Sequence, residues 1–211
     1  MNGTSILDDL RYRVPTVPTA GPGTTGLAWL RASVVRFSEG PDRVRRRELV
    51  ERVLAGVVVR PHADPTVALL RGLGLSERVQ DRVENVVEDV AAVAAAYQPH
   101  APQTPAADAA LDRLVRAWGE YDEPTAALIC VVVQAHAATR AMLALAESGR
   151  TGPAVPSTRR VGPDGVEVEV DLTDAPFGRG RHACPGESLA RELVAGALAA
   201  GTRTTVDGTS R

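Results

Sequence analysis

The residues best suited to chemistry lie in one run near the C-terminus, from Phe177 to Gly186, which reads Phe-Gly-Arg-Gly-Arg-His-Ala-Cys-Pro-Gly. An amphipathic pattern follows directly and predicts a helix over residues 187–200. A cysteine at the N-terminal end of a helix is favoured as the thiolate by the helix dipole, and Arg179 and Arg181 add positive charge beside it. A thiolate is a soft metal ligand, and porphyrin iron is one of its partners. The run therefore predicts a thiolate–metal site at Cys184.

Other interpretations of these residues are weaker but open. His182 and Cys184 are two residues apart and no second close Cys/His pair exists, which disfavours a zinc site with four protein ligands. The segment 178–180 lacks the lysine and threonine of a phosphate-binding loop. The remaining alternative is a Gly/Arg-rich turn with an ordinary cysteine. Cys130 lies in the apolar run 126–133 and is predicted to be a buried small hydrophobe, although a disulfide with Cys184 stays open.

The order Phe-x-x-Gly-x-His-x-Cys-x-Gly before a helix resembles the haem-binding loop of the cytochrome P-450 family at every fixed position. The resemblance implies that Cys184 is the axial iron ligand of haem b. It also implies that Phe177 packs near the sulfur and the porphyrin, and that His182 contacts a haem propionate. Gly178 allows the backbone to curl tightly around a flat ligand, and it completes the predicted cofactor-binding loop together with Gly186.

Two further segments resemble propionate-binding parts of that family. Residues 39–47 are similar to a segment Asp-Pro-Pro-x-His-x-x-x-Arg that opens a family helix; Arg43 replaces its His and Arg47 matches its Arg. The replacement keeps a donor and makes it permanently cationic. The strand 156–160 resembles the family strand at the haem edge, and Arg159 is predicted to point inward while Arg160 points away, because strand side chains alternate. The alternatives are a solvated helix face and a charged edge strand.

The apolar helix containing residues 131–139 aligns with the distal helix of the family, usually Ala-Gly-x-(Asp/Glu)-Thr-Thr. Ala137 and Ala138 stand where the family has an acid and a hydroxyl, so the usual proton donor is missing. A single helical histidine is more often structural than catalytic. The predicted catalytic residues are the polar side chains that remain on this helix: Gln134, His136 and Thr139.

Apolar spacing, proline and glycine predict a mainly α fold, a truncated cytochrome P-450-like helical domain with a small β element before the cysteine loop. The predicted helices cover residues 27–37, 41–59, 65–73, 76–97, 106–118, 123–146 and 187–200, and the predicted strands cover 157–161 and 166–170. Residues 1–25 are predicted to be irregular, 26–201 to form a single haem domain, and 202–211 to be a flexible tail.

The chain also departs from the family. Family members are about twice as long, and only residues 147–155 separate the distal helix from the strand, too few for the Glu-x-x-Arg helix that braces the cysteine loop. The N-terminal sheet of the family is also absent. Without that buried ion pair, we expect a less rigid loop and a haem affinity that depends more on arginine–propionate contacts.

The composition favours a soluble, cytoplasmic protein. The 211 residues carry a net charge of -2 with 3% aromatic residues, which argues against a nucleic-acid or membrane surface. There is no apolar leader within the first 25 residues. All basic side chains are arginine, which suits carboxylate binding.

The family resemblance implies a haem-thiolate oxidoreductase that inserts one oxygen atom into a small apolar organic substrate. An acidic ferredoxin-type electron donor would dock at Arg179 and Arg181. Because the distal donor is missing, peroxide use or non-oxygenase chemistry are alternatives. So are a non-catalytic haem-binding or partner protein and a degenerate remnant that holds no haem.

Overall fold

The computed structural model describes residues 3–75 and 83–207. Its helices are α1 (Gly3–Asp8), α2 (Gly26–Ser33), α3 (Gly40–Ala55), α4 (Pro65–Gly72), α5 (Val83–Ala96), α6 (Pro105–Trp118), α7 (Glu123–Glu147) and α8 (Glu187–Asp207), with short 3-10 turns η1 (Val35–Phe37) and η3 (Gly180–His182). Strands β1 (Ser157–Val161) and β2 (Glu167–Asp171) pair antiparallel, with Ser157 opposite Asp171. The prediction of a mainly helical fold with a small β element before the cysteine loop is confirmed.

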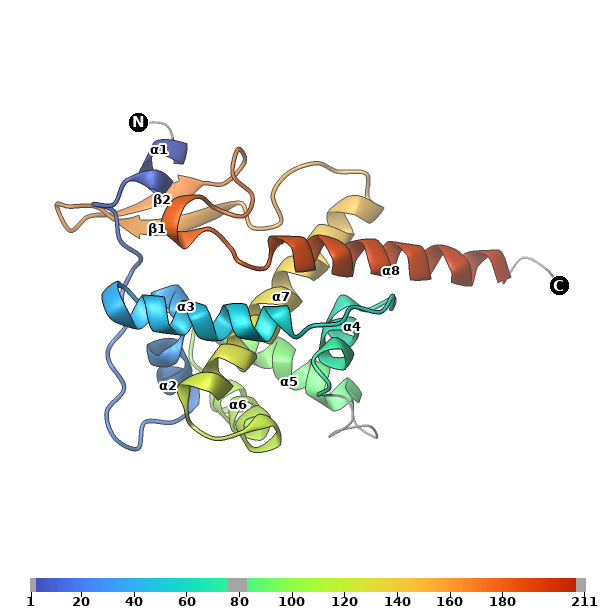
Figure 1. Ribbon diagram of the computed structural model, residues 1–211, viewed down its shortest axis with the longest axis horizontal. Coiled ribbons are helices and arrows are strands. Elements are labelled where there is room, and N and C mark those ends of the chain that lie inside the picture. Colours follow the sequence, from blue (N-terminus) through green and yellow to red (C-terminus); the bar gives the residue numbers. More distant parts are fainter. Residues whose placement is uncertain (1–2, 76–82, 208–211) are drawn as a thin grey trace.

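Helix α7 runs through the centre of the molecule, and α3, α4, α5 and α8 pack around it (Figure 1). It begins cleanly because Asp122 accepts a hydrogen bond from the Thr125 amide at 2.8 Å and Pro124 occupies the first turn. Its apolar residues from Ala126 to Val133 are largely buried, as predicted for Cys130. By length and composition alone α7 could cross a membrane, and 33% of its most apolar 18-residue stretch is buried inside the structure.

The main core is mostly aliphatic, with a few buried aromatic side chains such as Trp29 and Tyr97, and lies largely between α2, α5, α6 and α7. Leu30, Val90, Leu111 and Ile129 are fully buried there. Burial of each such side chain contributes about 1.5–3 kcal/mol. The core therefore fixes the position of α7, on which the other helices depend.

A second, smaller hydrophobic cluster joins the N-terminus to the hairpin. Leu7 of α1 packs against Val170, Leu172 and Ala175, so α1 lies on the β element (Figure 1). The prediction that residues 1–25 are irregular is wrong at α1, because this helix is held by a tertiary contact that local sequence does not reveal. Arg13 continues the attachment through backbone hydrogen bonds with Val161 of 3.0 and 2.8 Å.

Several predicted boundaries shift for local reasons. The predicted helix 27–37 divides into α2 and η1, and α3 ends at Ala55 rather than 59, because Gly56 and a run of three β-branched valines follow. Helix α8 continues to Asp207, past the predicted end at 200 and into the predicted tail, since no proline interrupts it. The first residues of the predicted helix 76–97 lie outside the described residues, up to position 82.

Candidate functional site

The cysteine loop is closed by its own backbone. Gly178, at φ +71°, donates to the Ala175 carbonyl at 2.8 Å, and the Cys184 amide donates to the Phe177 carbonyl at 2.8 Å. Only glycine adopts this left-handed conformation without strain. The loop thus delivers Cys184, an exposed free thiol, to the base of α8.

Gly186, two residues after Cys184, lies close to Leu54 of α3. A Cβ atom added to Gly186 would lie 3.9 Å from Cys184 Sγ and 3.8 Å from Leu54 Cδ2. Burial raises the pKa of the Cys130 thiol in α7. The Phe177 ring lies under the guanidinium of Arg191, 5.0 Å from its centroid.

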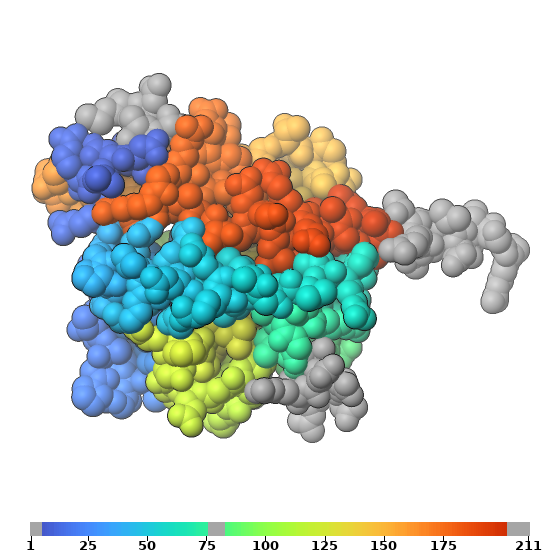
Figure 2. Space-filling model, in the orientation of Figure 1, coloured from blue at the N-terminus to red at the C-terminus, as the bar shows by residue number. Residues whose placement is uncertain are grey.

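Helix α3 binds the loop through two of the predicted arginines. Arg47 Nη1 donates to the Ala183 carbonyl at 2.7 Å, while its Nε pairs with Glu51. Arg43 Nε lies 3.4 Å from His182 Nδ1. In Figure 2 the loop rests directly on the start of α3. The structure therefore brings Arg43, Arg47 and His182 together beside Cys184.

The two arginines of β1 have the opposite orientation to the predicted one. Arg159 is exposed and pairs with Glu167 across the hairpin at 2.8 Å. Arg160 is 5% exposed and donates to Thr158 Oγ1 and to the Arg159 carbonyl. Burial lowers the pKa of Arg160, with further lowering by Arg36 and Arg181. Arg160 is therefore the inward side chain, and the prediction that Arg159 points inward is wrong.

Around Arg160 the loop carries an excess of positive charge. Glu39 supplies a carboxylate, with Oε1 3.2 Å from His182 Nε2 and Oε2 3.4 Å from Arg181 Nη2. Burial, reinforced by Arg160, Arg43 and Arg181, outweighs Glu39 and lowers the pKa of His182 to about 4. His182 is thus neutral near pH 7.

Two buried nitrogens in this region have no hydrogen-bond partner among the described residues, Arg36 Nε and His182 Nε2. The short approach of His182 Nε2 to Glu39 does not have hydrogen-bond geometry. Unpaired buried donors are costly unless a ligand satisfies them. The residues therefore fit a ligand with carboxylates next to Cys184, and the two propionates of a haem have that chemistry.

The three predicted catalytic side chains on α7 do not converge. Gln134 Nε2 donates to Cys130 Sγ at 2.7 Å, so it lies on the same face as that thiol. His136 hydrogen-bonds with Thr66 of α4 at 2.9 Å, and burial lowers its pKa. Thr139 donates to the Ala135 carbonyl of its own helix at 2.7 Å. Gln134, His136 and Thr139 thus each have a different partner, and the structure does not bring them together.

Sequence reasoning missed Arg36, Glu39 and Arg160 as members of the site. A signal existed for Arg36, a charge within the apolar run Val34-Val35-Arg36-Phe37. Glu39 is the residue before α3, a position favoured by shorter polar side chains that cap their own helix. Neither signal indicates which distant segment the side chain reaches.

No protein-family model and no curated protein matches this sequence. Among solved structures, the chain is similar to P450BioI, crystallised with an acyl carrier protein ligated to hexadec-9Z-enoic acid. The match has a TM-score of 0.58 and 16% sequence identity, and it covers 94% of this chain and 81% of that chain.

The molecule thus belongs to the mainly helical fold class, with one two-stranded sheet in the part of the chain that the structure describes. More specifically, it has a cytochrome P-450-like fold, shortened to 211 residues, as the cysteine loop predicts.

Proposed function

We propose that the chain binds haem b with Cys184 as the axial ligand and acts as a haem-thiolate oxidoreductase of the cytochrome P-450 type. One observation carries the proposal: buried cationic side chains without enough carboxylate partners gather beside the loop that presents Cys184. The P-450-like fold supports the same assignment, because it is the fold in which the loop motif is familiar.

Each side chain has a distinct role in this proposal. Arg43, Arg160 and His182 contact the propionates, and charge-assisted bonds of this kind are the strongest available to carboxylates. Arg47 is a positioning residue, because its hydrogen bond to the Ala183 carbonyl holds the residue before Cys184. Arg160 takes the role predicted for Arg159, whose charge is already paired with Glu167.

The loop residues complete the binding surface. Phe177 packs beside the macrocycle, and Gly178 and Gly186 keep the loop close to it. Haem with a thiolate ligand supplies redox chemistry in which the sulfur donates electron density to the iron. Gln134 is the polar side chain of α7 that shares a face with Cys130, so it is our candidate for the distal hydrogen-bond donor.

Partners follow from the same chemistry. Buried valines near Gln134 suit a small apolar organic substrate. An acidic ferredoxin-type donor would use Arg179, which is exposed, more than Arg181, whose guanidinium donates to the Tyr12 carbonyl at 3.0 Å. A reducing cytoplasmic setting, in which Cys184 stays a free thiol, suits this function.

A second candidate is a haem-binding protein without turnover. Ala137 and Ala138 offer no proton donor, and the hydroxyl of Thr139 is already bound to its own helix. Haem uptake without product formation, with either an electron donor or peroxide, would favour this candidate.

The ligand assignment is tested by optical spectroscopy of the purified chain with haem, dithionite and carbon monoxide. We expect a Soret band red-shifted in the manner of thiolate ligation, which Cys184→Ala abolishes. Cys130→Ala is the matched control, because it removes the other thiol of the chain and leaves the band in place. Persistence of the thiolate band in Cys184→Ala, or no haem uptake by the folded chain, would refute the proposal.

A further inference from the structure

Glu39 occupies the cap position of α3 but does not cap it. The side chain accepts no hydrogen bond from the first turn of that helix. Its side chain is 17% exposed, and the carboxylate lies beside the cysteine loop instead. The residue therefore serves a contact outside its own helix.

The carboxylate of Glu39 connects three segments that are distant in sequence. Oε1 accepts a hydrogen bond from the Val14 amide at 2.8 Å and lies 3.2 Å from His182 Nε2, while Oε2 lies 3.4 Å from Arg181. Glu39 is also the carboxylate that opposes the positive charge around Arg160. The Glu39 carboxylate thus lies beside the same cationic side chains that a carboxylate of a bound ligand would contact.

We propose that Glu39 is a built-in substitute for a ligand carboxylate, which holds the cationic site in the ligand-free chain and is displaced when a haem propionate binds. The inference rests on the proposed function, because it concerns the same site. It adds that binding is a competition: the incoming carboxylate gains His182 only by removing Glu39 from it, and Arg181, which Glu39 also faces, loses this partner at the same time.

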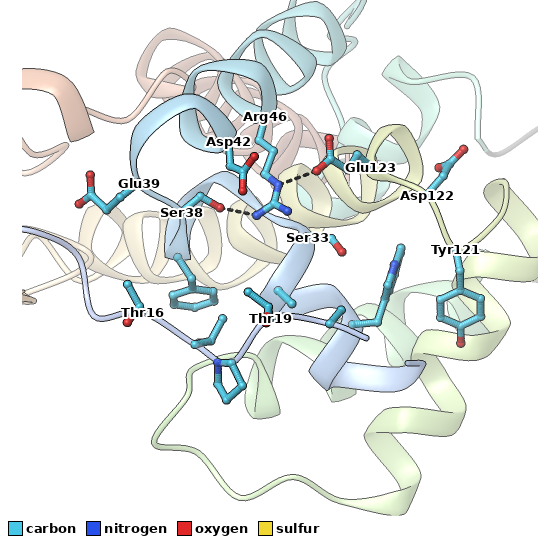
Figure 3. A pocket seen from close by; sticks show the side chains of 16 residues that line it. Thr16, Thr19, Ser33, Ser38, Glu39, Asp42, Arg46, Tyr121, Asp122 and Glu123 are labelled. Carbon is cyan, nitrogen blue, oxygen red and sulfur yellow. Dashed lines mark hydrogen bonds and ion pairs between the residues drawn. The ribbon is translucent and has the colours of Figure 1, made fainter. Parts of the chain in front are cut away.

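The structure leaves space for the displaced side chain. Glu39 lines a cavity of about 710 Å³ on its other side, between the segment 16–20 and the start of α3 (Figure 3). A carboxylate that turns into this cavity can be solvated, so its release from the cations does not leave a buried unpaired charge.

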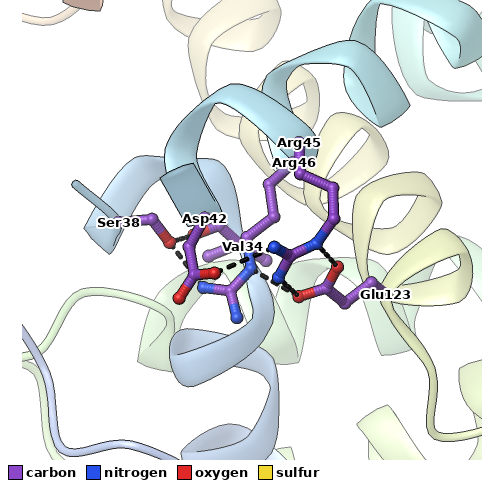
Figure 4. A network of polar contacts seen from close by, with 6 residues as sticks. All are labelled: Val34, Ser38, Asp42, Arg45, Arg46 and Glu123. Carbon is purple, nitrogen blue, oxygen red and sulfur yellow. Dashed lines mark hydrogen bonds and ion pairs between the residues drawn. The ribbon is translucent and has the colours of Figure 1, made fainter. Parts of the chain in front are cut away.

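The backbone that carries Glu39 stays fixed while the side chain moves. Arg46 donates to Ser38 Oγ at 2.5 Å and to Glu123 at 2.9 Å, and Arg45 pairs with Glu123 and Asp42 (Figure 4). This network ties the start of α3 to the start of α7. Displacement therefore requires a rotation of one side chain and leaves Arg43 and Arg47 in place.

Release of Glu39 has a consequence at the N-terminal segment. The Val14 amide loses its acceptor, and Arg181, which also holds the Leu10 and Tyr12 carbonyls, is drawn toward the ligand. Ligand binding and the order of residues 10–14 are therefore linked, and the linkage is reciprocal.

The test uses metal-free protoporphyrin IX, which has propionates but cannot form an iron–sulfur bond, and its dimethyl ester, which lacks the carboxylates. Glu39→Gln keeps the shape of the side chain and an acceptor for Val14 while removing the charge. We expect it to bind protoporphyrin IX about tenfold more tightly than the natural chain, a difference of about 1.4 kcal/mol. Binding of the ester should not change. Glu48→Gln, an exposed carboxylate on the same helix, is the matched control for net charge and should match the natural chain.

Hydrogen exchange supplies a second readout, in which protoporphyrin IX should speed exchange at the Val14 amide of the natural chain. Equal or weaker porphyrin binding by Glu39→Gln, no porphyrin binding by either protein, or slower exchange at Val14 would overturn the inference. Because no iron is present, these outcomes are independent of the Cys184→Ala spectrum. Failure of the thiolate assignment can thus be told apart from failure of the Glu39 assignment.

Discussion

Replacement of Gly180 by alanine tests how closely the cysteine loop depends on the N-terminal helix. Gly180 has φ +62°, and a Cβ there would lie 2.9 Å from the Leu7 carbonyl oxygen and 3.1 Å from Asp8 Oδ1. Gly165 in the hairpin turn has φ +79° and nothing within 4 Å of its Cβ position. The pair therefore separates backbone strain, which both positions share, from the close approach to α1.

The expected magnitudes follow from these distances. Left-handed backbone costs an alanine about 1 kcal/mol, which is the full effect expected for Gly165→Ala. In Gly180→Ala the Leu7 carbonyl must also shift, and Leu7 is 4% exposed in its cluster with the hairpin. Loss of that burial adds about 2 kcal/mol, for a total of about 3 kcal/mol.

Urea unfolding followed by far-UV circular dichroism measures both variants against the natural chain. The free energy of unfolding should fall by clearly more in Gly180→Ala than in Gly165→Ala. Equal losses in the two variants would show that α1 does not rest on the loop, and would remove the structural basis for coupling the N-terminus to Cys184.

Two further predictions concern charged residues. Hydrogen bonds from Arg45 and Arg46 lower the pKa of Glu123 to about 2 from an ordinary 4.5. A shift of this size corresponds to about 3 kcal/mol of stability. Because Arg45 is half exposed and solvent screens the pair, we expect Glu123→Gln to lower the free energy of unfolding by about 1–2 kcal/mol at neutral pH. The lowered pKa stabilises the fold above pH 4.5, and this stability is lost as the pH falls through about 2. The free energies of unfolding of the natural chain and Glu123→Gln, measured in urea, should therefore converge near pH 2. A difference that stays constant with pH would contradict the assignment. Arg160→Ala should weaken binding of protoporphyrin IX about tenfold, whereas Arg159→Ala should leave the affinity within about twofold. A fluorescence titration measures both affinities. If Arg159→Ala had the larger effect, Arg159 rather than Arg160 would be the propionate ligand, as the sequence predicts.

The cysteine loop, the hairpin and most helices could be predicted because their signals are local. Gly178, the Pro163-Asp164-Gly165 turn and the apolar spacing of α7 each act within a few residues. The facing of β1 could not be predicted in this way. A shift of one residue in strand phase exchanges the two faces, and here the phase depends on pairing with β2 and on the bridge between Arg13 and Val161.

The composition of the cationic site was also beyond the sequence, for a related reason. Arg36 lies in η1, Glu39 just before α3 and Arg160 in β1, and no motif in the sequence indicates that these three side chains meet. A buried charge within an apolar run indicates that a partner must exist. Only the three-dimensional structure shows that several of these positive charges have the same carboxylate, Glu39, as their partner.

The shortened chain also raises the question of what replaces the brace of the cysteine loop. Residues 148–156, between α7 and β1, contain no helix, so the loop has no Glu-x-x-Arg pair behind it there. Instead, Arg47 of α3 holds the Ala183 carbonyl from one side, and Arg181 reaches the Tyr12 carbonyl on the other. The loop is therefore tied by hydrogen bonds to carbonyls, which survive loss of a single carboxylate better than a buried ion pair does. Such ties make the loop position depend on the N-terminal segment. The displacement of Glu39 that we propose would act on the same connection, because this carboxylate links the Val14 amide to His182.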